Sequence, residues 1–130
     1  MRKLHGCPPL KLDIELAGSA QAYAEVLASK NAFQHSGNPH VGENLAKQSG
    51  FGADFSGHFS QVIWKDTKSV GMGKAMCRDG RTIVVVGQYQ PPGNFMGEWG
   101  RNVLPVLRGQ PRRLTLEELG MVILYFINSI

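Results

Sequence analysis

The residues best suited to chemistry in this chain fall in two short runs. His35 and Ser36 lead to Glu43 in the first run, and His58 lies near the start of the second, which continues to Thr67. Neutral imidazole nitrogens suit zinc, and a carboxylate can bind a metal directly or orient an imidazole through a hydrogen bond. Two imidazoles and one carboxylate on an otherwise apolar frame indicate a small polar cleft.

Both runs match a long family pattern. Residues 57–67 fit G-H-[FY]-[ST]-Q-[LIV]-[LIV]-W-x-x-[STN] at every defined position. Residues 35–45 contain the H-S…G-E-N-L element, and residues 2–10 fit R-x-x-H-G-x-P-P-L. The chain therefore resembles the CAP superfamily (SCP/TAPS domain) of cysteine-rich secretory, antigen 5 and pathogenesis-related proteins, and within it the Golgi-associated pathogenesis-related branch.

The resemblance implies an α+β fold, an α-β-α sandwich with an antiparallel sheet of three or more strands. Relatives place a helix with a W-[YF]-x-E motif where this chain has only residues 46–56, so one helix is expected to be missing. The helix that precedes the R-x-x-H-G pattern is also expected to be absent, which makes Met1 look like a late start. We expect an incomplete CAP domain over residues 1–105, followed over residues 106–130 by a basic linker and an apolar C-terminal helix.

Local patterns predict the main elements. A helix is expected from about Asp13, its N-cap, to Ser29, with Ile14, Ala17, Ala20 or Ala24, and Leu27 on its apolar face. Strands are expected at His58–Trp64, Val70–Cys77 and Thr82–Gln90, and Asp79-Gly80 predicts a hairpin between the last two. The β-branched run in the third strand favours a central position in the sheet.

Composition narrows the class of partner. The chain has 130 residues and a net charge of +4, which mildly favours anionic surfaces but falls short of a nucleic-acid footprint. Cys7 and Cys77 are expected to be free thiols, although one bridge between them is an alternative. The start of the chain has no signal-peptide pattern, and Arg2 rules out myristoylation. The resemblance to the Golgi-associated branch implies a cytoplasmic protein, peripheral on Golgi membranes; an extracellular location is the alternative if the full-length product has a signal peptide.

Motif by motif, the resemblance assigns the cleft to His35, Glu43 and His58, with His35 and His58 as ligands of zinc or another divalent ion. The family's second cleft glutamate belongs to the missing helix, although Asp54 is a candidate replacement. Three ligands are reached only if Glu43 binds the metal directly. The equally weighted alternative is a His35–Glu43 hydrogen bond that only ties down a loop. His5 is expected at a helix end and His40 in solvent.

Three functions remain open from the sequence. The first is a non-enzymatic CAP domain that binds lipid or an anionic membrane surface, as a monomer or a homodimer. The second is a metal-dependent hydrolase or protease that uses His35 and His58. The third is a destabilised splice or gene-model variant without independent function, because loss of helices exposes apolar surface that costs about 2.5 kcal/mol per 100 Å².

Overall fold

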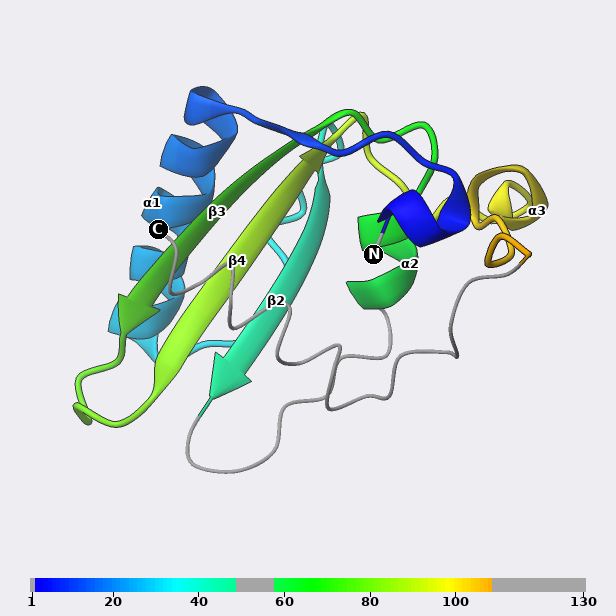
Figure 1. Cartoon of the computed structure of the whole chain (residues 1–130). Coiled ribbons are helices and arrows are strands. Elements are labelled where there is room, and N and C mark those ends of the chain that lie inside the picture. The colour runs from blue at the N-terminus through cyan, green and yellow to red at the C-terminus, as the bar shows by residue number, and fades with distance from the viewer. Residues whose placement is uncertain (1, 49–57, 109–130) are drawn as a thin grey trace.

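A four-stranded sheet with one long helix against it forms the frame of the computed structural model (Figure 1). The structure describes residues 2–48 and 58–108, without the side chains of Gln48 and His58. The elements are the 3₁₀ helix η1 (Arg2–His5), the strands β1 (Lys11–Leu12), β2 (Gly42–Gln48), β3 (Ser69–Met76) and β4 (Ile83–Gln90), and the helices α1 (Ile14–Lys30), α2 (His58–Ile63) and α3 (Trp99–Asn102). This arrangement confirms the expected α+β class.

The strand order is β1-β3-β4-β2, so β4 is central, as its β-branched run predicts. Antiparallel pairing joins β4 to both β2 and β3, whereas the short β1 pairs with β3 in parallel. The expected β3–β4 hairpin is confirmed. Its turn is closed by Asp79, whose carboxylate accepts hydrogen bonds from the N–H groups of Arg81 and Thr82, both at 2.8 Å.

Helix α1 confirms the predicted helix and its cap. The side chain of Asp13 accepts a hydrogen bond from the Leu16 N–H at 3.0 Å, and Asn31 ends the helix in the left-handed conformation. The buried face, however, differs from the predicted one. It consists of Leu16, Ala20, Ala24, Leu27 and Ala28, and Ile14 is 89% exposed because packing on the sheet begins only at Leu16.

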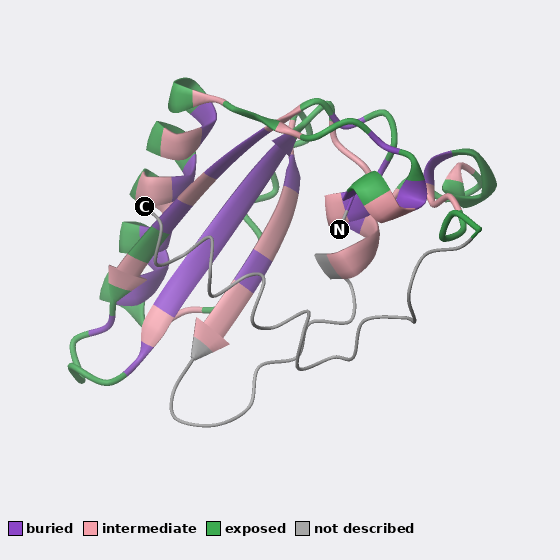
Figure 2. Ribbon diagram, in the orientation of Figure 1, coloured by how far each residue is buried: buried purple, intermediate pink, exposed green. Residues whose placement is uncertain are grey.

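Glycines in β3 let α1 lie unusually close to the sheet. A Cβ atom on Gly71 would lie 2.1 Å from the Ala17 nitrogen, and one on Gly73 would lie 2.3 Å from the Gln21 nitrogen. Alanines on the facing side of the helix complete this tight contact. Figure 2 shows the resulting buried layer along β4 and the inner side of α1, where Val84 and Val86 are fully buried.

Two elements correct the sequence prediction. The predicted strand His58–Trp64 is wrong, because His58–Ile63 forms helix α2. The third antiparallel strand is instead β2, which the sequence did not predict and which pairs with β4 from Gly42↔Tyr89 to Gln48↔Ile83. The alternation in 58–64 misled because Gln61 and Ile63 of the helix, and Trp64 just after it, are buried through contacts distant in sequence.

The buried guanidinium of Arg2 supplies one of those contacts. Its Nη atoms donate hydrogen bonds to the carbonyl oxygens of Val62, Trp64 and Thr67 at 3.0, 2.8 and 3.1 Å. Carbonyl groups at a helix C-terminus have no partner within the helix and need an outside donor. Arg2, near the N-terminus, therefore stabilises the end of α2, which lies about 60 residues further along the chain.

The remaining expectations have mixed outcomes. Cys7 and Cys77 are both buried and free, as expected. His5 ends η1 and is buried, and His40 is exposed, both as expected. Most of the short 46–56 segment and residues 109–130 of the predicted C-terminal region lie outside the described residues, so the domain boundary stays a prediction. Among the described helices, none is long and apolar enough to cross a bilayer.

The contact between α1 and β3 predicts opposite effects for two glycine substitutions. Gly71→Ala should lower the free energy of unfolding by about 1–3 kcal/mol, because its Cβ would overlap the α1 backbone. Gly18→Ala, on the exposed side of α1 with nothing within 4 Å, should raise it by about 0.5–1 kcal/mol. Urea denaturation of both variants measures this, and equal effects would contradict the packing.

Candidate functional site

A cleft of about 280 Å³ opens between two segments of the chain. One wall is formed by the loop from His35 to Val41 and the start of β2. The other is formed by residues 92–95, which follow β4, and Gln61 of α2 also lines the space. The cleft is open to solvent and contains two of the three residues that the sequence assigned to it, His35 and Glu43.

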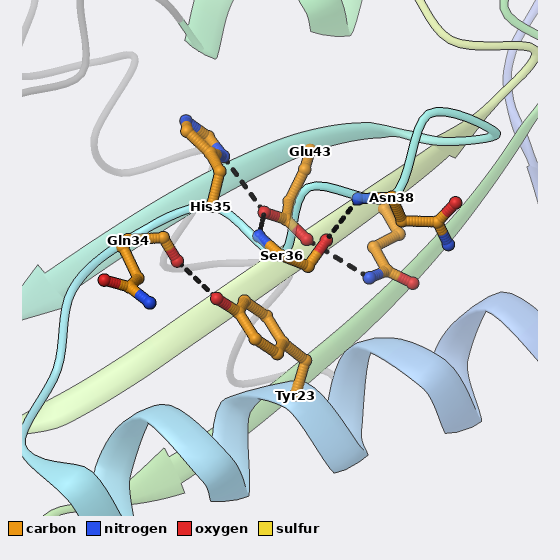
Figure 3. Close-up of polar contacts among 7 residues, drawn as sticks. Tyr23, Gln34, His35, Ser36, Asn38 and Glu43 are labelled. Atoms are coloured by element: carbon orange, nitrogen blue, oxygen red, sulfur yellow. Dashed lines mark hydrogen bonds and ion pairs between the residues drawn. The ribbon is translucent and has the colours of Figure 1, made fainter.

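Glu43 forms the centre of the polar network in this cleft (Figure 3). Its side chain is only 6% exposed. One carboxylate oxygen, Oε1, lies 3.0 Å from His35 Nδ1 and accepts the Ser36 N–H at 2.8 Å. The other oxygen, Oε2, accepts a hydrogen bond from Gln88 Nε2 at 3.2 Å, directly across from Glu43 in the β2–β4 register. Both oxygens are therefore engaged.

These hydrogen bonds control the ionisation of Glu43. Burial alone would raise the pKa of the carboxyl group, but the hydrogen bonds from Ser36, His35 and Gln88 outweigh it and lower the pKa below its ordinary value of 4.5. Glu43 is thus an anion with a stable set of donors around it. A general base for neutral pH needs the opposite, a pKa raised towards 7.

Tyr23 anchors the loop that carries His35 to helix α1. Its hydroxyl donates a hydrogen bond to the Gln34 carbonyl oxygen at 2.5 Å (Figure 3). Burial raises the pKa of this hydroxyl, and the negative charge of Glu43 raises it further. The phenol therefore remains protonated and keeps its role as a donor to the loop.

The imidazole of His35 is oriented by the carboxylate beneath it. Its side chain is 68% exposed, and Nδ1 faces Glu43. A carboxylate at Nδ1 favours the proton on that nitrogen and leaves the Nε2 lone pair free for a ligand. This donor set fits a zinc ligand at Nε2 of His35, with Glu43 orienting the ring rather than binding the metal.

The second predicted ligand cannot be placed at the level of its side chain. His58 is the first residue of α2, and this helix packs against β2, the strand that carries Glu43. The convergence of the two imidazoles stays a prediction, and Asp54 lies outside the described residues. Among the side chains that the structure describes, no group of three or more His, Cys, Asp or Glu residues could hold a metal.

Sequence reasoning missed the residue that joins the two walls of the cleft. Gln61 is 1% exposed; its Oε1 accepts the Gly93 N–H and its Nε2 donates to Thr67 Oγ1, both at 3.0 Å. Cβ atoms on Gly42 and Gly93 would lie 2.1 and 2.8 Å from Gln61 side-chain atoms. Gln88 was missed as well, although a glutamine in an otherwise apolar central strand is a readable signal for a buried polar contact.

The fold and this cleft define a CAP-type domain, and comparison with known proteins agrees. The model of the CAP family, described as the cysteine-rich secretory protein family, matches residues 1–89. The chain therefore belongs to the CAP family. It is 38% identical over 133 aligned positions to Golgi-associated plant pathogenesis-related protein 1 of Homo sapiens, an alignment that covers 80% of this chain and 85% of the relative. Pathogenesis-related protein 1 of Arabidopsis thaliana is 32% identical over 116 positions, with coverages of 72% and 71%.

Solved structures support the same fold. A crystal structure of NaASP2 with Zn²⁺ matches with a TM-score of 0.58 and 21% identity, covering 90% of this chain and 85% of that protein. The structure of MpPR-1i matches with a TM-score of 0.54 and 21% identity, covering 73% and 82%. At this identity the likeness concerns the fold alone.

The network around Glu43 predicts a pH-dependent loss of stability on its neutralisation. Because the folded-state pKa is lowered, the carboxylate stabilises the fold above the ordinary value of 4.5, and this contribution disappears as the pH falls through the folded-state pKa. Glu43→Gln should therefore lower the free energy of unfolding by about 1.5–3 kcal/mol at pH 7. The difference from the wild type should shrink in acid.

Denaturation curves at pH 7 and in acid measure this difference. Glu25→Gln is the matched control, because Glu25 is exposed on α1 and its effect should stay within about 0.5 kcal/mol. A Glu43→Gln penalty as small as that of the control would contradict the anchoring role.

Proposed function

We propose that this chain is a non-enzymatic CAP domain that binds anionic lipid at a membrane surface, with the His/Glu cleft as a remnant metal site. The observation that carries the proposal is the state of Glu43. Both of its oxygens accept hydrogen bonds and its pKa is lowered, so it serves as an anchor for the cleft wall and not as a proton acceptor.

The dimensions of the cleft favour recognition of a small polar group. Its volume of about 280 Å³ lies just below the range of pockets that enclose whole ligands, which runs from ~300 to 1,000 Å³. His35, Ser36 and Asn38 present polar atoms at its wall. A lipid headgroup fits such an open, polar space, while the acyl chains stay in the bilayer.

The net charge of the chain and the name of one relative support a membrane as the partner. The net charge of +4 attracts anionic leaflets, and one relative is by name Golgi-associated. We accordingly place the chain on the cytoplasmic face of Golgi membranes as a peripheral protein. An extracellular location remains the alternative, since the family also includes proteins described as secretory.

Vesicle flotation tests the proposal. The chain should float with vesicles that contain phosphatidylserine and remain unbound with pure phosphatidylcholine. The bound fraction should fall between low salt and ~0.5 M NaCl, because salt screens the attraction. Equal and negligible binding to both vesicle types would refute the proposal.

The orientation of His35 favours one alternative, a metal-dependent hydrolase. Its Nε2 is free for a ligand while a carboxylate holds Nδ1, an arrangement typical of zinc histidines. If His58 joins it, two histidines would hold the ion, one fewer than the three protein ligands of catalytic zinc sites. The metal would polarise a bound water, and Glu43 would orient His35.

Zinc calorimetry separates the two functions. We expect weak zinc binding to the wild-type chain, further reduced in His58→Ala and unchanged in the control His40→Ala, whose side chain is exposed. Tight binding that is lost in His58→Ala, together with zinc-dependent hydrolysis, would favour the hydrolase instead.

A further inference from the structure

The turn between β4 and α3 projects apolar side chains into solvent. Met96 is 95% exposed, Phe95 52% and Trp99 43%. The turn is closed by a hydrogen bond from the Glu98 N–H to the Phe95 carbonyl oxygen at 3.2 Å, and Gly97 adopts the positive φ of 81° that it requires. The segment from Phe95 to Trp99, called here the 95–99 turn, is thus an ordered apolar protrusion.

The 95–99 turn is fixed to the body of the domain at its C-terminal end. The ring of Trp99 packs edge-on against the buried Trp64, with 5.4 Å between the ring centroids. Phe95 at the other end lines the cleft. A surface that contacts this turn is therefore brought to the mouth of the cleft as well.

Basic side chains lie on the segments that adjoin α3. Exposed Lys65 follows α2, and its N–H donates to the Asn102 carbonyl oxygen at 3.0 Å. The exposed Lys3 and Arg108 flank the hydrogen bond from the Leu107 N–H to the Leu4 carbonyl oxygen. These segments cluster at one end of the molecule (Figure 1).

The two acidic side chains described in this region share one cation, Arg101. Glu98 and Asp66 both form ion pairs with Arg101, at 2.5 and 3.6 Å. Lys3, Lys65 and Arg108 have no ion pair among the described residues. Counted with Glu98, Asp66 and Arg101, four basic side chains stand against two acidic ones, so these six charged groups near the apolar protrusion sum to +2.

We infer that the 95–99 turn enters the interfacial layer of an anionic membrane, with Lys3, Lys65 and Arg108 contacting lipid headgroups. The inference rests on the proposed function and names the surface that performs it. An aromatic and apolar tip within a basic rim matches the interface, where apolar side chains reach the acyl boundary and cations meet anionic headgroups. Docking in this orientation brings the cleft to the headgroup layer.

Tryptophan fluorescence with brominated lipids tests the insertion directly. The chain has two tryptophans; Trp64 is 1% exposed, so a quenching signal from the bilayer reports on Trp99. On vesicles of brominated phosphatidylcholine and phosphatidylserine, we expect quenching and a blue shift.

Phe95→Ser/Met96→Ser should weaken vesicle binding on the order of tenfold or more. Met96→Ser alone, at an almost fully exposed position, gives a smaller loss without risk to the fold.

Matched controls remove similar groups elsewhere on the surface. Leu12→Ser/Ile14→Ser takes away two side chains that are 75% and 89% exposed, one in β1 and one at the start of α1, and it should bind like the wild type. Lys65→Glu/Arg108→Glu should lose binding on the order of tenfold at low salt. The control Lys11→Glu/Lys68→Glu makes the same change in net charge at exposed positions near β1 and should lose far less.

The outcomes separate this inference from the proposed function. Vesicle binding that is equally strong in Phe95→Ser/Met96→Ser, or that leaves Trp99 unquenched, would overturn the inference and leave the lipid function intact. A wild-type chain that fails to bind anionic vesicles would overturn both.

Discussion

The interaction on which the candidate site depends is the buried carboxylate of Glu43. It binds the loop at His35 and Ser36 to the sheet, where its own strand β2 already pairs with β4, the central strand that carries Gln88. A buried charge is tolerated only where donors satisfy it, and the three donors here come from two segments, the 35–36 loop and β4. The same donors that fix the cleft wall lower the pKa of Glu43. The hydrogen bonds that position the cleft wall are therefore the same ones that make Glu43 a weaker base.

The frame around this carboxylate is held by close backbone approach and by polar contacts distant in sequence. Gly71 and Gly73 let α1 lie directly on β3, which places Tyr23 where it can hold the loop of His35. On the opposite side of the cleft, Gln61 links α2 to the segment at Gly93, while Arg2 holds the end of that helix. Gln61 thereby connects the two walls of the cleft, because Gly42 of the other wall packs closely against its side chain.

Local sequence signals predicted the elements whose stability is local. The caps at Asp13, the turn at Asp79-Gly80 and the β-branched run of β4 each specify their structure within a few residues, and all three are confirmed. Helix α2 and strand β2 depend instead on distant partners. Alternation over 58–64 could not reveal that Arg2 donates hydrogen bonds to carbonyl groups at the end of α2. The G-E-N-L segment forms a strand only because it pairs with β4. The motif match predicted one cleft for His35 and Glu43, and both residues line the same cavity; a motif carries tertiary information that periodicity lacks.

We propose that this cleft binds a ligand and does not transfer protons, and the ionisation of Glu43 is the property that distinguishes the two roles. Carbon-detected NMR can follow the side-chain carboxyl resonance of Glu43 from about pH 2 to pH 8, with Glu43→Gln to assign the signal. We expect the titration midpoint of Glu43 to lie below the ordinary value of 4.5. A midpoint raised to about 6–7, where a general acid or base operates, would contradict it.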